Sequence, residues 1–102
     1  MTPEEFYNGP AKAMLQRADD IMRPKMVDYA GDADFSANFT RTAERAGLTP
    51  AQVWTVFADK HWGAICAYAR NGQTESEDIR DRIADLINYC LLLSGMIEEG
   101  TA

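Results

Sequence analysis

The sequence predicts an all-α fold: a small helical bundle of three main helices plus an N-terminal helix, in a single domain over residues 1–102. Apolar residues recur at helical spacing through most of the chain, and no stretch of useful length alternates with the period of two that marks a strand. Helix start and stop signals separate these stretches. The links between them are short, which predicts antiparallel neighbours in a bundle.

The composition is that of a folded, acidic protein. A hydrophobic content of 46% is ordinary for a globular chain, and a chain of 102 residues buries roughly two-thirds of its unfolded surface. The net charge of −6 repels the phosphates of a nucleic acid at long range, so we expect no direct nucleic-acid binding. The same charge suits a cation site or a basic partner.

The chain shows neither a signal peptide nor a membrane segment. Its start, MTPEEFYNGP, lacks a basic region and an apolar core, and its longest apolar run is far shorter than the ~20 residues that span a bilayer. Cys66 and Cys90 lie in apolar helical patterns outside any CxxC motif, so we interpret both as small buried side chains in a reducing compartment. We therefore expect a cytoplasmic protein without a membrane partner.

The N-terminal third is predicted to form one helix between two proline-containing breaks. Thr2-Pro3-Glu4-Glu5 is a helix start, with Thr at the N-cap and Glu at N3. Asn8-Gly9-Pro10 interrupts it, and the helix restarted at Pro10 ends or kinks at Arg23-Pro24, because the residue before a proline is pushed out of the α region. Residues 25–31 then form a connector.

The other helices are bounded by stronger signals. One spans about residues 33–46 and stops at Gly47, and the next begins at the capping box Thr49-Pro50-Ala51-Gln52 and runs to about Arg70. The last spans residues 76–99 and is closed by a glycine. Further candidate N-caps are Asp32 or Asp34 for the first of these helices, and Thr74 or Ser76 for the last.

The main candidate site lies on the last helix. Asp81, Asp85 and Asn88 stand at i, i+4 and i+7 on one helix face. Carboxylates one turn apart can share Mg²⁺, which prefers oxygen ligands and usually also binds substrate phosphates. The alternative for Asp81 is an ion pair with a neighbouring arginine. For Asp85 and Asn88 the alternative is a structural hydrogen-bond network, since a buried carboxylate needs either a cation or hydrogen bonds.

Lys60 and His61, in the middle of the long helix, form a second candidate group. Lys60 shares its face with apolar residues, so it reaches out to water, pairs with Asp81 or Asp85, or binds a phosphate. His61 is the one histidine of the chain, and a lone histidine is a poor zinc ligand and more often makes a structural hydrogen bond. The sequence contains no P-loop, GxGxxG, GxSxG or HExxH motif.

Two further features indicate contact surfaces. Trp62 is expected to be more exposed than the other aromatic residues, and to mark a base-stacking surface or a subunit interface. The run Tyr89–Leu93 is apolar around the whole helix, so a small bundle leaves one of its faces uncovered. We therefore expect a homo-oligomer, with a symmetric dimer as the default.

Short motifs along the chain resemble a known family. They are Lys25-x-x-Asp28-Tyr29-Ala30, Asp34-Phe35-x-x-Asn38-Phe39, Lys60-His61-x-x-Ala64-Ile65 and Ser76-Glu77-x-x-x-x-Arg82-x-x-Asp85-Leu86-x-Asn88-Tyr89. In this order, over about residues 24–97, they resemble the small phage and prophage proteins described as nucleotide-modification-associated or MazG-like domains. These are related by analogy to the all-α nucleoside-triphosphate pyrophosphohydrolases.

The resemblance implies a helical bundle, often dimeric or tetrameric, that handles nucleotides with Mg²⁺. In MazG-like enzymes an ExxE helix faces an ExxD helix, and the acids hold Mg²⁺ against the triphosphate. Asp85 matches the Asp of the second motif, but Arg82 stands in place of its Glu. The ExxE motif is absent from the middle helices, where Lys60 occupies the kind of place expected for an acid. The domain has therefore either a modified site or the fold without the reaction.

Our leading expectation is a MazG-like protein of the host cytoplasm, phage-encoded, that binds a nucleotide or another phosphate-bearing small molecule. If it is active, it hydrolyses the α–β bond of a nucleoside triphosphate. Asp81 and Asp85 would hold Mg²⁺, Lys60 would neutralise phosphate charge, and Asn88 would orient Asp85. The residues expected to touch the substrate are Lys60, His61, Trp62 and Asn88.

The alternative is a non-enzymatic, phage-type helical homodimer that binds and modulates a host protein. The acidic surface and the apolar run Tyr89–Leu93 motivate it. The two hypotheses differ in one structural respect. A nucleotide site needs Asp81, Asp85 and Lys60 in one pocket, whereas a protein-binding dimer leaves them in solvent or paired with arginines.

Overall fold

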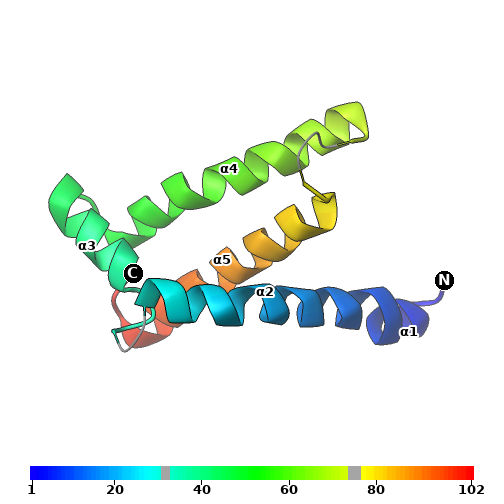
Figure 1. Cartoon of the computed structure of the whole chain (residues 1–102), viewed down its shortest axis with the longest axis horizontal. Helices are drawn as coiled ribbons and strands as arrows, with labels where there is room; N and C mark the ends of the chain where they lie inside the picture. Colours follow the sequence, from blue (N-terminus) through cyan, green and yellow to red (C-terminus); the bar gives the residue numbers. More distant parts are fainter. Residues whose placement is uncertain (31–32, 74–76) are drawn as a thin grey trace.

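The computed structural model confirms an all-α fold (Figure 1). The structure describes residues 1–30, 33–73 and 77–102, and within these ranges it contains no strand. In the same ranges, no helix combines the length and the apolar content that a bilayer crossing requires. The elements are α1 (Pro3–Phe6), the π-helix η1 (Tyr7–Ala11), α2 (Lys12–Ala30), α3 (Ala37–Ala46), α4 (Pro50–Asn71) and α5 (Ile79–Glu99).

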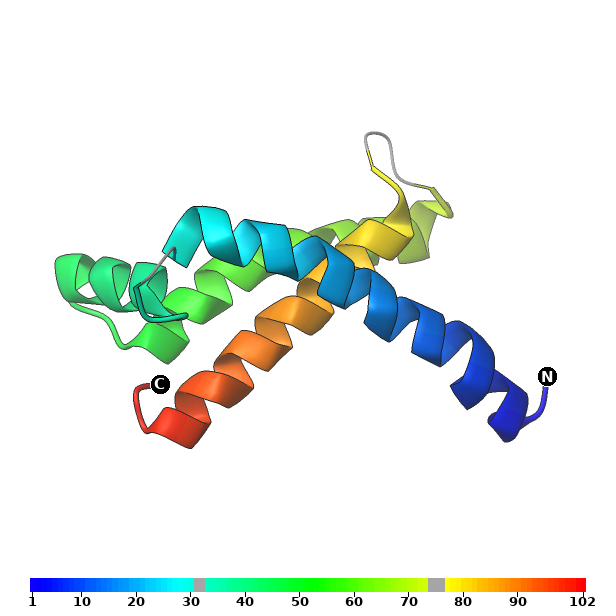
Figure 2. The same ribbon diagram turned by 60° about the horizontal axis from the view of Figure 1, so that its bottom comes forward.

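The last helix, α5, is the element that the others contact most. It packs against α4 on one side and against α2 on the other, and α3 packs against α4. Figure 2 shows that α2 and α5 cross, so that the N-terminal half of α2 projects beyond the bundle together with α1. The molecule is correspondingly elongated, with extents of 45 × 28 × 23 Å.

The hydrophobic core sits where α3, α4 and α5 meet. Phe39 and Ala43 of α3, Val53 of α4 and Met96 of α5 are buried there, in contact with one another. Each large apolar side chain that is fully buried contributes about 1.5–3 kcal/mol relative to exposure. Around this centre lie six partly buried apolar residues: Phe35, Trp54, Phe57, Tyr89, Leu92 and Leu93.

Local capping signals predicted several helix ends correctly. The Thr49 side chain accepts a hydrogen bond from the backbone N–H of Gln52 at 3.1 Å, and the Gln52 side chain accepts one from the backbone of Thr49, which is the predicted capping box. The predicted stop at Gly47 is also confirmed, since this residue adopts a left-handed conformation with φ of +70°. Both features depend only on residues within one turn of the helix end.

The N-terminal region departs from the prediction. Pro10 lies within η1, whose wider turn lets the proline ring avoid the carbonyl of Phe6, so the chain stays helical where a break was expected. Pro24 lies inside α2, and residues 25–30 are helical, so the connector predicted there is wrong. Pro24 has no N–H to donate to the backbone carbonyl of Asp20, so one helix hydrogen bond is lost. Both residues are exposed, so water can donate to that carbonyl instead.

Two other helix starts also differ from the sequence-based expectation. Helix α3 begins at Ala37 rather than near residue 33, and the carboxylate of Asp34 accepts hydrogen bonds from the backbone N–H and the hydroxyl of Ser36 before it. Helix α5 is capped by Asp78, whose side chain accepts from the backbone N–H of Arg80. The other proposed caps, Asp32, Thr74 and Ser76, lie outside the described residues.

Candidate functional site

A cavity of about 240 Å³ lies at the junction of α2, α3, α4 and α5. Each of these helices contributes a polar group to it. The polar lining consists of Lys25 from α2, Asn38 from α3, Lys60 and His61 from α4, and Asp85 and Asn88 from α5. The apolar lining consists of Met22, Met26, Phe35, Phe39, Tyr89 and Leu92. Four of the residues singled out in the sequence, Lys60, His61, Asp85 and Asn88, therefore share one cavity.

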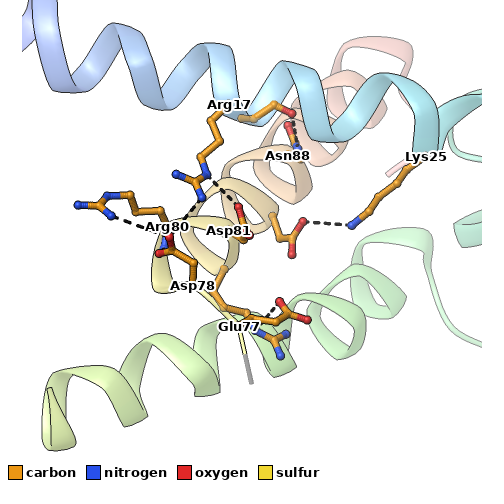
Figure 3. Close-up of polar contacts among 10 residues, drawn as sticks. Arg17, Lys25, Glu77, Asp78, Arg80, Asp81 and Asn88 are labelled. Atoms are coloured by element: carbon orange, nitrogen blue, oxygen red, sulfur yellow. Dashed lines mark hydrogen bonds and ion pairs between the residues drawn. The ribbon is translucent and has the colours of Figure 1, made fainter. Parts of the chain in front are cut away.

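Asp85 has two polar neighbours in this cavity. Its Oδ1 atom lies 3.4 Å from Nζ of Lys25, one of the contacts between α2 and α5 drawn in Figure 3. Its Oδ2 atom lies 3.5 Å from Nδ1 of His61, and the Asp85 side chain is only 13% exposed. A carboxylate this buried needs such partners, so Asp85 is held by α2 and α4 together.

His61 is a buried, neutral histidine at neutral pH. Burial lowers its pKa, because the charged ring loses hydration, and this outweighs the attraction of Asp85 for a proton. Its Nδ1 atom also lies 3.5 Å from a guanidinium nitrogen of Arg82. Depending on which ring nitrogen carries the proton, Nδ1 donates to Asp85 or accepts from Arg82. The ring lies against Tyr89, with centroids 5.2 Å apart.

Lys60 supplies positive charge to the cavity without a carboxylate partner. It forms no ion pair with any described residue, so the predicted pairing of Lys60 with Asp81 or Asp85 is not formed. Among the described residues, the charged groups that line the cavity are Lys25, Lys60 and Asp85, which sum to one positive charge when His61 is neutral. In a chain with a net charge of −6, the described lining of this cavity therefore carries more positive than negative groups.

Asn88 offers an unused hydrogen-bond acceptor. Its Nδ2 atom donates to the backbone carbonyl of Ala18 at 2.8 Å, which ties α5 to α2 where the helices cross (Figure 3). Its Oδ1 atom is buried and has no hydrogen-bond partner among the described residues. A buried acceptor without a donor costs about 1–3 kcal/mol. Asn88 itself lines the cavity, so a ligand donor that reached this atom would remove that cost.

Asp81 does not belong to this cavity. Its carboxylate accepts a hydrogen bond from Nε of Arg17 at 2.8 Å, and Arg17 also contacts Asp78 (Figure 3). This is the arginine pairing considered as the alternative for Asp81, although the partner comes from α2 rather than from α5. The Arg82 side chain pairs with Glu77, with the closest atoms 3.3 Å apart. The predicted carboxylate pair is therefore not brought together in the cavity. Of the three residues expected to converge in a nucleotide site, Lys60 and Asp85 line the cavity, whereas Asp81 is paired with an arginine.

The donor set does not form a metal site on its own. Within the described ranges, no group of three or more His, Cys, Asp or Glu side chains is placed to hold a metal ion. Among the described residues, Asp85 is the one carboxylate that lines the cavity, and it already contacts Lys25 and His61. Magnesium binding stays a prediction that rests on Asp85 and on the phosphates of a bound ligand.

Other predicted residues lie elsewhere. Trp62 is 56% exposed, as expected, but it does not line the cavity. Cys66 is half-buried and Cys90 is exposed, so the interpretation of both as buried is wrong. Within the run Tyr89–Leu93, Leu91 is 56% exposed. This confirms the prediction that one face of the run is uncovered.

Sequence reasoning missed Lys25 as a site residue. The sequence predicts a connector at this position, because a proline at residue 24 favours the end of a helix. The signal that could have identified it is the spacing of Met22, Lys25 and Met26, which is i, i+3 and i+4 on one helix face. All three line the cavity.

A comparison with protein-family models, with curated proteins and with solved structures finds no match to this chain. The candidate site is therefore interpreted from its own geometry. It combines a cationic side (Lys25 and Lys60), a buried acceptor (Asn88) and an apolar wall with aromatic rings. Such a cavity suits a small anion that also carries an aromatic or apolar part and a hydrogen-bond donor.

Proposed function

We propose that this protein binds a nucleotide, or a closely related phosphate-bearing small molecule, in the cavity between α2, α3, α4 and α5. The observation that supports this most directly is the shared position of two ammonium groups and one buried acceptor. Lys25 and Lys60 line the same cavity as Asn88, whose Oδ1 atom is buried and has no hydrogen-bond partner among the described residues. The resemblance of the short motifs to MazG-like domains points to the same class of ligand.

The two lysines are suited to the phosphate end of the ligand. An ammonium group is a compact point charge that commonly binds phosphates. Lys60 is exposed and has no carboxylate partner to displace in the described part of the chain, whereas Lys25 would exchange its 3.4 Å contact with Asp85 for the phosphate. The phosphates therefore lie at the solvent side of the cavity, near Lys60.

The apolar wall is suited to the base or the sugar. Phe35, Phe39 and Tyr89 line it, and aromatic faces stack on nucleobases. The Oδ1 atom of Asn88 accepts a hydrogen bond from an amino group or a hydroxyl group of the ligand. The cavity of about 240 Å³ is smaller than the roughly 300–1,000 Å³ typical of drug-sized ligands. It therefore holds a nucleoside-sized part, and additional phosphates extend into solvent.

The proposal concerns binding. Pyrophosphate release from a nucleoside triphosphate, with Mg²⁺ between Asp85 and the phosphates, stays a separate prediction from the motif resemblance. One carboxylate that is already paired with a lysine and a histidine supports binding better than it supports metal-assisted hydrolysis.

Calorimetric titration with a panel of nucleosides and nucleoside mono-, di- and triphosphates tests the proposal, with and without Mg²⁺. We expect binding by at least one phosphate-bearing compound and weaker binding by its nucleoside. The substitution Lys60→Ala should weaken binding about tenfold, the effect of losing one charge-assisted contact of ~1.4 kcal/mol. The matched control is Lys12→Ala, an exposed lysine outside the cavity, which should bind like the unmodified protein. No binding by any phosphate-bearing compound would contradict the proposal.

A further inference from the structure

The carboxamide of Asn88 is held in one orientation. Its Nδ2 atom donates to the backbone carbonyl of Ala18 at 2.8 Å (Figure 3), so turning the amide over would place two acceptors against each other. The atom left for another partner is therefore Oδ1, which is buried and accepts no hydrogen bond from the described residues. Asn88 is only 7% exposed and lines the cavity. A ligand can satisfy this atom only with a hydrogen-bond donor.

The cavity-lining residues of α5 run from a charged end to an apolar end. Asp85, at the charged end, contacts Lys25 and His61. Leu92, at the apolar end, packs against the hydrophobic core. Asn88 stands between them, about 4.5 Å along the helix axis from Asp85 and about 6 Å from Leu92, because a helix rises 1.5 Å per residue. Asn88 therefore occupies the middle of this wall.

The aromatic rings of the cavity lie toward the apolar end. Phe39 belongs to the buried core, and Phe35 lies beside the C-terminal half of α5, since a Cβ atom on Gly95 would approach its ring to 2.9 Å. The Tyr89 ring lies between the two ends, with its centroid 6.3 Å from that of Phe39 and 5.2 Å from that of His61. Nucleobases stack on aromatic faces, so a base belongs at the apolar end.

We propose that the cavity recognises the sugar of its nucleotide, through a hydrogen bond from a ribose hydroxyl group to Oδ1 of Asn88. This contact rests on the proposed function and assigns Asn88 to one part of the ligand. In a nucleotide the sugar lies between the phosphate and the base. With the phosphate near Lys25 and Lys60 and the base on the aromatic rings, the sugar lies opposite Asn88. Its hydroxyl groups are the donors available there, and the 2′-hydroxyl distinguishes ribose from deoxyribose.

Calorimetric titration with the four ribonucleoside 5′-monophosphates and their 2′-deoxy and 3′-deoxy analogues tests this contact. For each ribonucleotide that binds, we expect one of its two analogues to bind about tenfold more weakly, because the buried acceptor then stays without a donor. The analogue that loses affinity identifies the hydroxyl group. Asn88→Ala should bring the ratio of the two affinities close to one. The control is Lys60→Ala, which should weaken the binding of ribonucleotide and analogue alike and leave their ratio unchanged.

Two results would overturn the sugar contact while leaving the proposed function standing. One is equal affinity of the unmodified chain for a ribonucleotide and both of its deoxy analogues. This comparison needs no variant, so it decides the matter even if Asn88→Ala does not fold. The other is a preference for ribose that persists in folded Asn88→Ala, since another group would then bind the hydroxyl. If no nucleotide binds at all, the proposed function fails, and the sugar contact fails with it.

Discussion

Nδ1 of His61 lies 3.5 Å from Oδ2 of Asp85, across the interface between α4 and α5. The two side chains are only 7% and 13% exposed. Burial keeps the imidazole neutral, and Lys25 lies near the carboxylate. This relationship fixes how stability and ligand binding should respond to pH and to substitution.

Stability is expected to fall as the pH is lowered from 7 to 5. The pKa of His61 is lower in the folded state than its ordinary value of 6.5, so the unfolded chain binds more protons between these two pKa values. The contribution of uncharged His61 to the free energy of unfolding is therefore full above about pH 6.5. It is lost as the pH falls toward the pKa that His61 has in the folded protein. Urea unfolding at a series of pH values measures this, and His61→Gln should remove most of the slope. Asp78 does not interfere, because its lowered pKa acts only below about pH 4. An unchanged slope in the variant would show that another group is responsible.

Asp85→Asn distinguishes a lysine-based phosphate site from a magnesium site. The substitution removes the negative charge beside Lys25, so the charge around the cavity rises from one to two positive charges. If the lysines bind the phosphate, affinity measured by calorimetry should rise a few-fold, as expected for ~1 kcal/mol. If Mg²⁺ bridges Asp85 and the phosphate, affinity should instead fall, and only in the presence of Mg²⁺. The test therefore decides the role of Asp85 with one variant.

Asn88→Ala should have a smaller effect on stability than on binding. The variant loses the hydrogen bond from Nδ2 to the carbonyl of Ala18, which is worth about 0.5–1.5 kcal/mol. It also removes the buried acceptor that has no partner among the described residues, which offsets part of that loss. Chemical denaturation measures the first effect. Binding of the best nucleotide should weaken about tenfold, because the ligand loses its acceptor. Unchanged affinity would exclude Asn88 from the site.

Gly95 and Gly63 provide a matched pair for packing. A Cβ atom on Gly95 would lie 2.9 Å from Cε2 of Phe35, whereas a Cβ atom on Gly63 meets nothing within 4 Å. The close contact in Gly95→Ala should destabilise the protein by roughly 1–3 kcal/mol, and the higher helix propensity of alanine should offset part of this loss. The new methyl group should also displace the Phe35 ring from the cavity. Gly63→Ala should stabilise it by roughly 0.5–1 kcal/mol, because only propensity changes. Thermal unfolding compares the two, and equal effects would contradict the close approach of Phe35.

Much of the helical structure could be predicted from single residues, but the path of α2 could not. The ends at Gly47 and Thr49 follow from hydrogen bonds within one turn. Pro24 was expected to end a helix, and local preference alone supports that expectation. The helix continues because the lost hydrogen bond is on an exposed side and because α2 packs against α5. Because α2 continues past Pro24 and packs on α5, Lys25 lies on the helix and lines the cavity.

The sequence by itself determined the helical class, the caps and the stripe of Asp81, Asp85 and Asn88 on one helix, because each depends on residues three or four apart. The tertiary structure alone decided which of these polar groups face the cavity. Helix α2 crosses α5 so that Arg17 meets Asp81, while Lys25 meets Asp85 one turn further along. These partners are separated by 64 and 60 residues in the chain, so no local pattern encodes them. The crossing of two helices therefore left one carboxylate in a surface ion pair and placed the other beside a cationic cavity.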